Sequence, residues 1–352
     1  MSVTRVPSCR LSACGIGSLL LAAAVLAGCA SAASRTTSPT APPSASASPV
    51  PAALASPSPL VTAAPTGSPS AGPTTSPSAG PPGLLPAYFL AWKPGYSPKD
   101  AHGVVLMDYG ADHGVQYQPT TIASAAIGYY NRWLTDTDPA QTAADKAAFL
   151  TQTDWLIAHQ TNDGRWLFTF SWGSQPVPWW SAMTEGVGMS ALLRAYAMTG
   201  DPAARVAVEL ARTTFDRDLD HLGVGAQVSL GDTSYVVYQE YLRGYEENVL
   251  NGWIFSLVGL YEASIYLQDP RAAQALWDPD RGIAAVRALL PYYDTGSWSR
   301  YDMVNPGPAV RGSLDTSAYH SLVISQLRYL GAITGDPFFT GYAERFQSYE
   351  RS

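Results

Sequence analysis

The chain has 352 residues, of which 46% are hydrophobic and only 14% are charged, and its formal net charge is −7. All 28 acidic residues but only 18 of the 21 basic residues follow residue 82, so this later part of the chain carries a net charge of −10. This balance excludes a uniformly basic surface for nucleic acid or a sulfated polymer, although it leaves room for a local basic cleft.

Residues 1–29 have the pattern of a bacterial lipoprotein signal peptide. Arg5 and Arg10 precede an apolar run from Ile16 to Leu26, which is too short to cross about 30 Å of hydrocarbon. The run ends in Leu-Ala-Gly-Cys29, which resembles the lipobox in which the cysteine receives acyl chains. We therefore expect lipidation of Cys29 and an extracytoplasmic protein held at the cell membrane by this anchor alone. An ordinary secretory signal with a chance cysteine is the alternative.

Residues 30–82 consist almost entirely of Ser, Pro, Ala and Thr, with Arg35 as their only charge. Such a segment has too little apolar bulk to offset the entropy of ordering the chain, so it is expected to be a disordered tether. The three cysteines all precede the tether. No disulfide or cysteine metal site is therefore expected in the domain that follows, and a hydrophobic core must hold it together.

Residues 83–352 are long enough for one large domain, and apolar residues recur in them at helical spacing. Three related turns contain the dipeptide Asp-Pro, in which Asp can cap a helix and Pro fits its first turn. About eight helices are predicted, with starts near Pro119, Pro139, Ser181, Pro202, Leu250, Pro270, Ser317 and Pro337.

Paired helices joined by short turns favour a mainly α fold, an incomplete α/α toroid whose inner helices surround a cleft. A plain helical bundle or solenoid is the alternative. The stretch from Ala226 to Tyr241 alternates enough to form a small β-hairpin around Gly231-Asp232 at the cleft. Loops rich in aromatic and polar residues are expected to carry the chemistry.

Four short segments carry a resemblance to a known family. They are Trp179 to Met183, Tyr238 to Tyr241 with the following Val249 to Gly252, Gly296 to Asp302, and Tyr319-His320. In this order they resemble the catalytic domain of the heparosan and heparan sulfate glucuronyl C5-epimerases. The likeness extends from about residue 114 to the C-terminus, and any one of the motifs alone would be weak.

The resemblance implies an α/α-barrel domain that turns D-glucuronate into L-iduronate within a polysaccharide, without a redox cofactor. The C5 hydrogen lies α to a carboxylate, so its removal gives an enolate-like dianion whose charge must be neutralised. A second group must then deliver a proton to the opposite face. Two proton carriers that flank one sugar ring are therefore required.

The family's glutamate and tyrosines fall on Glu240, Tyr241, Tyr301 and Tyr319. Because a glutamate is normally ionised near pH 7 and a tyrosine is not, Glu240 is expected to act as the base and Tyr319 as the acid. Tyr241 and Tyr301 would orient the carboxylate or protonate the enolate oxygen. Without the resemblance, each tyrosine would more often be a packing residue and Glu240 a solvated charge.

Several residues are candidates for binding the substrate. An arginine can hold a uronate carboxylate through two hydrogen bonds. A histidine such as His320 is more often packed or hydrogen-bonded than catalytic. The five histidines lack metal-ligand spacing, so no metal is expected. The candidates are Arg165, Arg243, Arg300, Arg311, His320 and Trp180.

The sequence departs from the family where the heparan enzymes carry basic residues. The only basic residue between Tyr301 and Tyr319 is Arg311. Val304, Asn305 and Thr316 stand where the resemblance leads us to expect charge. A uronate-containing polysaccharide is the expected partner, but these departures argue against a highly sulfated one. The oligomeric state stays open, a homodimer included.

Three alternative functions remain. A polysaccharide lyase would use the same carbanion to expel the C4 substituent. A glycoside hydrolase on the same fold would need two carboxylates, with Glu185 and either Glu240 or Asp302 as the pair, and Glu185 would then face the cleft rather than solvent. A non-catalytic glycan-binding lipoprotein would keep the aromatic loops without chemistry.

Overall fold

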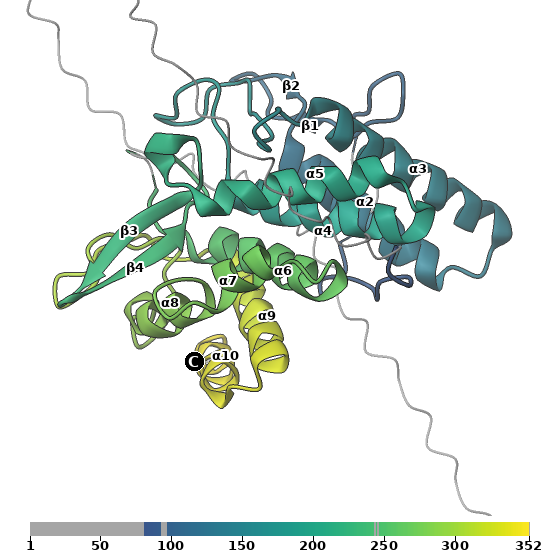
Figure 1. Cartoon of the computed structure of the whole chain (residues 1–352). Helices are drawn as coiled ribbons and strands as arrows, with labels where there is room; N and C mark the ends of the chain where they lie inside the picture. Colours follow the sequence, from purple (N-terminus) through teal and green to yellow (C-terminus); the bar gives the residue numbers. More distant parts are fainter. Residues whose placement is uncertain (1–80, 93–96, 243, 245, 352) are drawn as a thin grey trace, which may run out of the picture. The chain divides into compact units, whose positions relative to one another are not determined.

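The computed structural model describes residues 81–92, 97–242, 244 and 246–351. The expected signal peptide, Cys29 and residues 30–80 of the expected tether lie outside these ranges, so they stay predictions. The described residues contain nine α-helices and two antiparallel pairs of strands (Figure 1). None of these helices is long and apolar enough to cross a membrane.

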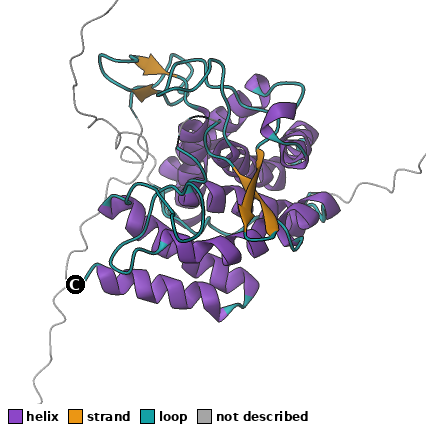
Figure 2. Ribbon diagram, turned by 90° about the vertical axis from the view of Figure 1, so that its left-hand side faces the viewer, coloured by secondary structure: helices purple, strands orange, loops and turns teal. Residues whose placement is uncertain are grey.

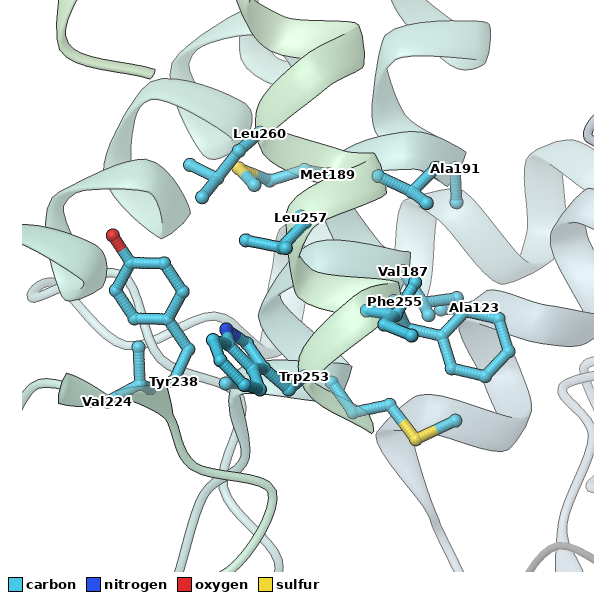
Figure 3. Packing of buried hydrophobic residues seen from close by; sticks show 14 of the residues in the cluster. Ala123, Val187, Met189, Ala191, Val224, Tyr238, Trp253, Phe255, Leu257 and Leu260 are labelled. Carbon is cyan, nitrogen blue, oxygen red and sulfur yellow. The ribbon is translucent and has the colours of Figure 1, made fainter. Parts of the chain in front are cut away.

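Four helices form an inner layer in which each packs against the next. They are α2 (Pro119–Thr135), α4 (Ala182–Thr199), α6 (Leu250–Tyr266) and α9 (Ser317–Thr334) (Figure 1). In α4, 15 of the 18 residues are buried, which is expected of a helix that is covered on every side. Figure 3 shows Ala123 of α2, Val187 of α4 and Phe255 of α6 in one group of buried side chains.

The helices α4 and α6 approach closely because glycines lie between them. A Cβ on Gly186 would lie 2.7 Å from the carbonyl oxygen of Phe255, and a Cβ on Gly259 would lie 2.6 Å from the Cα of Gly186. Both contacts involve backbone atoms, which cannot rotate away as a flexible side chain could. The close approach joins the N-terminal part of α4 to the middle of α6.

Four helices form an outer layer, and each follows its inner partner along the chain and packs against it. They are α3 (Pro139–His159), α5 (Pro202–Arg212), α7 (Pro270–Trp277) and α10 (Pro337–Tyr349). These helices are amphipathic: α5 buries Ala204, Ala207, Val208 and Ala211, which lie on one face at helical spacing.

All four outer helices begin with the dipeptide Asp-Pro. In each case the aspartate side chain accepts a hydrogen bond from the backbone N–H two residues later and the proline occupies the first helical position. The capping residues are Asp138, Asp201, Asp269 and Asp336. Gly200 and Gly335 end α4 and α9 in the left-handed conformation. The predicted turns are therefore confirmed.

The fold is mainly α and has the inner and outer helices of an incomplete α/α toroid, as predicted. One helix, α8 (Gly282–Leu289), was not predicted from the sequence. It has only eight residues, and Arg281 at its N-cap makes no side-chain cap hydrogen bond. It therefore lacks the local signals by which the other helices could be recognised.

The predicted β-hairpin is present as β3 (Gly225–Leu230) and β4 (Thr233–Tyr238), drawn in orange in Figure 2. Leu230 pairs with Thr233, so Gly231 and Asp232 form the turn. A smaller pair joins β1 (Met107–Asp108) to β2 (Val115–Gln116). The 3-10 helices are η1 (Thr213–Asp216), η2 (Leu219–His221) and η3 (Leu290–Tyr293). Strand β4 leads directly to Glu240.

Residues 85–92 contact all four inner helices. The carbonyl oxygens of Leu85 and Pro86 accept hydrogen bonds from Tyr130 of α2 and Arg194 of α4. The ring of Trp92 lies 5.5 Å from that of Phe255 in α6, and Phe89 stacks on Tyr329 of α9 at 4.4 Å. This segment therefore belongs to the core of the domain.

Candidate active site

The catalytic candidates lie where the N-terminal turns of the inner helices meet. The backbone N–H of Leu250, which begins α6, donates to the carbonyl oxygen of Tyr301 at 3.0 Å. The N–H of Ala182, which begins α4, donates to the carbonyl oxygen of Gln239 at 2.9 Å. The segments that carry Glu240 and Tyr301 are thus fixed to the ends of two inner helices.

A chain of contacts joins the four candidates. The Tyr241 hydroxyl forms hydrogen bonds with the Glu240 carboxylate and with the Tyr301 hydroxyl. The rings of Tyr301 and Tyr319 lie 5.1 Å apart between centroids and are tilted by 51°. All four side chains are buried. The structure therefore brings together the glutamate and the three tyrosines that the sequence singles out.

Burial changes the charge state expected for Glu240. Desolvation, together with the negative charge of Glu246, raises the pKa of the Glu240 carboxyl to about 8, although the hydrogen bond from Tyr241 opposes this rise. The expectation of an ionised Glu240 at pH 7 is therefore wrong, because with this pKa only about a tenth of the carboxyl is ionised there. Burial also raises the pKa of Tyr241 and of Tyr301 well above the usual value.

A glycine in the first turn of α6 makes room for the glutamate. A Cβ on Gly252 would collide with Oε2 of Glu240 and would lie 2.8 Å from its Cδ. Any larger residue at this position must displace the carboxyl group. From the sequence, Gly252 is expected only to serve helix entry and packing, although it belongs to the motif that follows Tyr238 to Tyr241 after a short gap.

Asn251, the residue before Gly252, is a second site residue without a predicted role. It is only 1% exposed, and neither Oδ1 nor Nδ2 has a hydrogen-bond partner among the described residues. Asn251 lies one turn before Phe255, which packs on Trp92 inside the ring of inner helices, so both residues share the inward face of α6. A buried amide without partners is costly, which makes Asn251 a candidate for contact with substrate.

The arginines predicted to bind the substrate are placed differently from one another. Arg165 is 12% exposed and holds Asp163 at 2.7 Å, so its charge is already paired. Arg300 donates to the carbonyl oxygen of Gly312, while its buried Nε has no partner among the described residues. Arg311 is exposed, and Arg243 lies outside the described residues. Of these arginines, the three that the structure describes are not among the causes of the pKa shifts at Glu240, Tyr241 or Tyr301.

Trp180 and His320 are both buried and make hydrogen bonds within the protein. Trp180 is 8% exposed, its Nε1 donates to the carbonyl oxygen of Gly223, and the guanidinium of Arg165 lies 4.3 Å from its ring centroid. His320 is fully buried and both of its ring nitrogens are engaged, Nδ1 with Ser299 and Nε2 with the carbonyl oxygen of Phe346. Both side chains are engaged inside the protein, and a role of either in binding substrate stays a prediction.

The carboxylates proposed for a hydrolase are also engaged. Glu185 faces neither solvent nor an open cleft: it is fully buried, and its Oε1 accepts from the backbone N–H of Trp166 at 3.1 Å. Burial raises the pKa of Glu185 well above the usual range. Asp302 accepts from the backbone N–H of Ser313 at 2.6 Å. Both carboxyl groups hold loops in place. Within the described residues no group of three or more His, Cys, Asp or Glu side chains could hold a metal ion.

A pocket of about 320 Å³ adjoins the cluster, and Tyr241 forms part of its wall. Its other walls come from η2 with the preceding Asp218, from β3, and from the residues that flank Tyr241. The lining residues are Asp218, Leu219, Ala226, Gln227, Val228, Gln239, Tyr241, Leu242, Glu247 and Asn248.

Comparisons with known proteins point to one family. A sequence model described as D-glucuronyl C5-epimerase C-terminus matches residues 160–348. Over 219 residues the chain is 29% identical to the D-glucuronyl C5-epimerase of Caenorhabditis elegans, a match that covers 57% of this chain and 35% of the nematode protein. Over 183 residues it is 25% identical to an uncharacterized protein of Methanocaldococcus jannaschii, covering 52% of this chain and 56% of that protein. The chain thus spans well under two thirds of either relative.

Among solved structures, the chain is similar to the unsaturated glucuronyl hydrolase of Bacillus sp. GL1, which is described as responsible for the degradation of glycosaminoglycan. The sequence identity is 18%, the TM-score is 0.42, and the match covers 65% of this chain and 61% of the hydrolase.

Proposed function

This chain belongs to the family of the D-glucuronyl C5-epimerase C-terminus, and we propose that it inverts C5 of uronic acid residues within an extracellular polysaccharide. The observation that carries the proposal is the contact chain from Glu240 through Tyr241 and Tyr301 to Tyr319. It places one carboxyl group and three phenols in a single buried cluster, which suits the transfer of protons to and from one carbon.

In the forward direction Glu240 removes the proton from C5. The electron pair of the broken C–H bond moves into the carboxylate and gives an enolate-like dianion. Tyr319 then delivers its hydroxyl proton to C5 on the opposite face, and the electron pair returns to form the new C–H bond. The product is an isomer, so no oxidant or reductant is consumed.

The reaction leaves a proton on Glu240 and a negative charge on Tyr319, and the free enzyme must be restored. The hydrogen bonds of Tyr241 with Glu240 and with Tyr301 connect the first carrier to the neighbour of Tyr319. The ring contact between Tyr301 and Tyr319 carries no proton, so exchange with water or with a substrate hydroxyl returns each carrier to its starting state. A base with a pKa of about 8 is also well matched to reversible proton exchange near neutral pH.

The substrate carboxylate needs donors, and we assign this role to the first turn of α6. The N-terminus of a helix attracts anions through its free N–H groups and its dipole. Asn251 lies in this turn and its buried amide has no partner among the described residues, so Nδ2 can donate to a carboxylate oxygen. This arrangement would stabilise a single uronate charge although position 304 holds a valine instead of a basic residue.

The test is C5 exchange in deuterated water with a panel of unsulfated and sulfated uronate polymers. We expect deuterium to enter C5 without chain cleavage, and we expect Tyr319→Phe to slow this exchange at least about 100-fold, since general acid–base catalysis contributes about that much or more. Tyr329→Phe is the matched control, because Tyr329 lies on the same helix and stacks on Phe89, outside the cluster.

Other outcomes of this experiment point to the alternatives. A rise in absorbance from an unsaturated product would indicate a lyase, and the release of reducing ends a glycoside hydrolase. Binding of a polymer without exchange on any substrate would indicate a glycan-binding protein. The proposal fails if no polymer exchanges at C5 or if Tyr319→Phe exchanges as fast as the wild type.

A further inference from the structure

Ser299, Asp315 and His320 form a buried cluster of polar side chains beside the tyrosines Tyr301 and Tyr319. Each of the three residues is at most 5% exposed. The Ser299 hydroxyl contacts the Asp315 carboxyl, and it lies 2.6 Å from Nδ1 of His320. Ser299 lies two residues before Tyr301, and His320 directly follows Tyr319. The cluster therefore connects the two segments that carry these tyrosines.

The contact of Ser299 with His320 reaches further than the backbone does. Two backbone hydrogen bonds join residues 299–301 to residues 313–315, and both end before α9, the helix that carries Tyr319. The side-chain contact extends the connection to the helix itself. It thereby holds the first turn of α9 against the segment of the other tyrosine.

The donors in this cluster indicate where its protons lie. The backbone N–H of Ser299 donates to Nδ1 of His320 at 3.3 Å, so Nδ1 is an acceptor. Nε2 then carries the proton, which it donates to the carbonyl oxygen of Phe346 at 2.9 Å. The Ser299 hydroxyl has a single hydrogen, which cannot serve both Nδ1 and the Asp315 carboxylate. Both contacts are satisfied if the Asp315 carboxyl donates a proton to the Ser299 oxygen while the hydroxyl donates to Nδ1.

The surroundings of Asp315 favour this protonated form. Desolvation raises the pKa of the Asp315 carboxyl to about 7, and the negative charge of Asp302 adds to the rise, whereas the hydrogen bond with Ser299 opposes it. No cation is among the causes of this shift. Oδ1 of Asp315 has no hydrogen-bond partner among the described residues, so no second donor stabilises the carboxylate.

We propose that a proton held in this cluster keeps Tyr319 in place beside Tyr301. The hydrogen bonds run from the Asp315 carboxyl through the Ser299 hydroxyl and the His320 ring to the backbone of α10. These three side chains are positioning residues for the two tyrosine rings, whose centroids are 5.1 Å apart. The inference rests on the proposed function for its meaning, but its first test does not need activity.

The first test is NMR spectroscopy of the full chain at pH 6, where a carboxyl with a pKa of about 7 is mostly protonated. The His320 ring, identified by the signal that His320→Gln removes, should be neutral with its proton on Nε2. Nuclear Overhauser contacts between the rings of Tyr301 and Tyr319 should persist in Asp315→Asn, because the amide N–H replaces the O–H donor. They should weaken in Ser299→Ala. A cationic His320, or ring contacts that Ser299→Ala leaves unchanged, would overturn the proposal.

The second test measures kcat and KM for C5 exchange at the same pH. Ser299→Ala and Asp315→Ala should each lower kcat at least about tenfold, because a displacement of about 1 Å at a catalytic group can cost about 100-fold. KM should change less than about twofold. Asp315→Asn should keep most of the wild-type kcat, which a role of the carboxylate charge would not allow.

Ser325→Ala is the matched control for the kinetic test. Ser325 also lies in α9, and its hydroxyl donates to the carbonyl oxygen of Ser321 in the same helix, so kcat should not change. Thermal unfolding of each variant separates loss of position from loss of the fold. An Asp315→Asn variant as slow as Asp315→Ala would contradict the protonated carboxyl. If the wild type exchanges no C5 hydrogen, the proposed function fails, while the NMR test still decides whether the cluster positions the tyrosines.

Discussion

Glu240 combines the two properties that the proposed chemistry needs, a fixed position and a pKa close to neutrality. Its carboxyl is 3% exposed, and desolvation raises the pKa to about 8. Such shifts are common at functional sites, but buried structural carboxyls also show them, as Glu185 does here. What separates the two residues is their contacts: Glu185 bonds to a backbone N–H, whereas Glu240 bonds to a tyrosine of the cluster.

The pKa of Glu240 predicts the pH dependence of both activity and stability. Because proton removal needs the carboxylate, kcat/KM for C5 exchange should rise with pH and reach half of its maximum near pH 8. The native pKa lies above the unfolded value of 4.5, so the unfolded chain loses its proton first and stability falls as pH rises from about 4.5 to 8.

Urea unfolding at pH 5 and pH 8 checks the stability prediction. The wild type should lose roughly 3 kcal/mol more than Glu240→Gln over this interval. A wild type and variant with parallel pH profiles would show that Glu240 is not buried in its neutral form.

At the scale of the element, the first turn of α6 combines three features. It holds Asn251 on the inward face, it leaves space for Glu240 at Gly252, and its first N–H fixes the segment of Tyr301. A single turn thus sets the positions of a base, a donor and a tyrosine.

The Asp-Pro caps explain which helix starts can be predicted from the sequence. Asp269 caps α7 through its own side chain, whereas α8 lacks such a cap and was not predicted.

Gly252→Ala tests this turn. The added Cβ forces the Glu240 carboxyl to move, and a displacement of about 1 Å in a catalytic group can cost about 100-fold in rate, so kcat/KM should fall by at least that factor. Gly341→Ala in α10 is the control, because its Cβ would meet no atom within 4 Å, and it should leave activity unchanged. Thermal unfolding of both variants separates loss of the site from loss of the fold. Full activity in Gly252→Ala would contradict the placement of Glu240.

At the scale of the whole domain, the segment from residue 85 to 92 joins the four inner helices. It supplies two carbonyl acceptors and three aromatic rings to the four helices. The buried ion pair of Arg194 with Glu262, at 2.8 Å, lies beside this segment and links α4 to α6. The second halves of α2, α4 and α9 and the second turn of α6 are thus joined by contacts that no single helix provides.

Trp92→Ala measures the contribution of this segment. Trp92 is 7% exposed and packs on Tyr88 and Phe255, so the substitution should lower the free energy of unfolding by about 3 to 5 kcal/mol in a urea titration. Trp277→Ala removes the same side chain from an exposed position, 46% accessible, and should cost under about 1 kcal/mol. Equal effects would mean that the segment contributes little to the core.

The sequence by itself determined the features that depend on nearby residues. The Asp-Pro turns, the hairpin at Gly231-Asp232 and the helical character of the domain follow from local backbone and capping chemistry. The four catalytic candidates were available only through the resemblance to the family, because an isolated tyrosine or glutamate carries no signature of catalysis.

Only the tertiary structure decided which of these residues can act and in which charge state. Trp180 and His320 were candidate ligands for a sugar in the sequence, yet each donates to or contacts a backbone carbonyl oxygen that is distant along the chain. Glu240 looked ionised, yet burial holds its pKa at about 8. Hydrogen-bond partners and desolvation arise from segments that meet only on folding, so local sequence chemistry cannot report them.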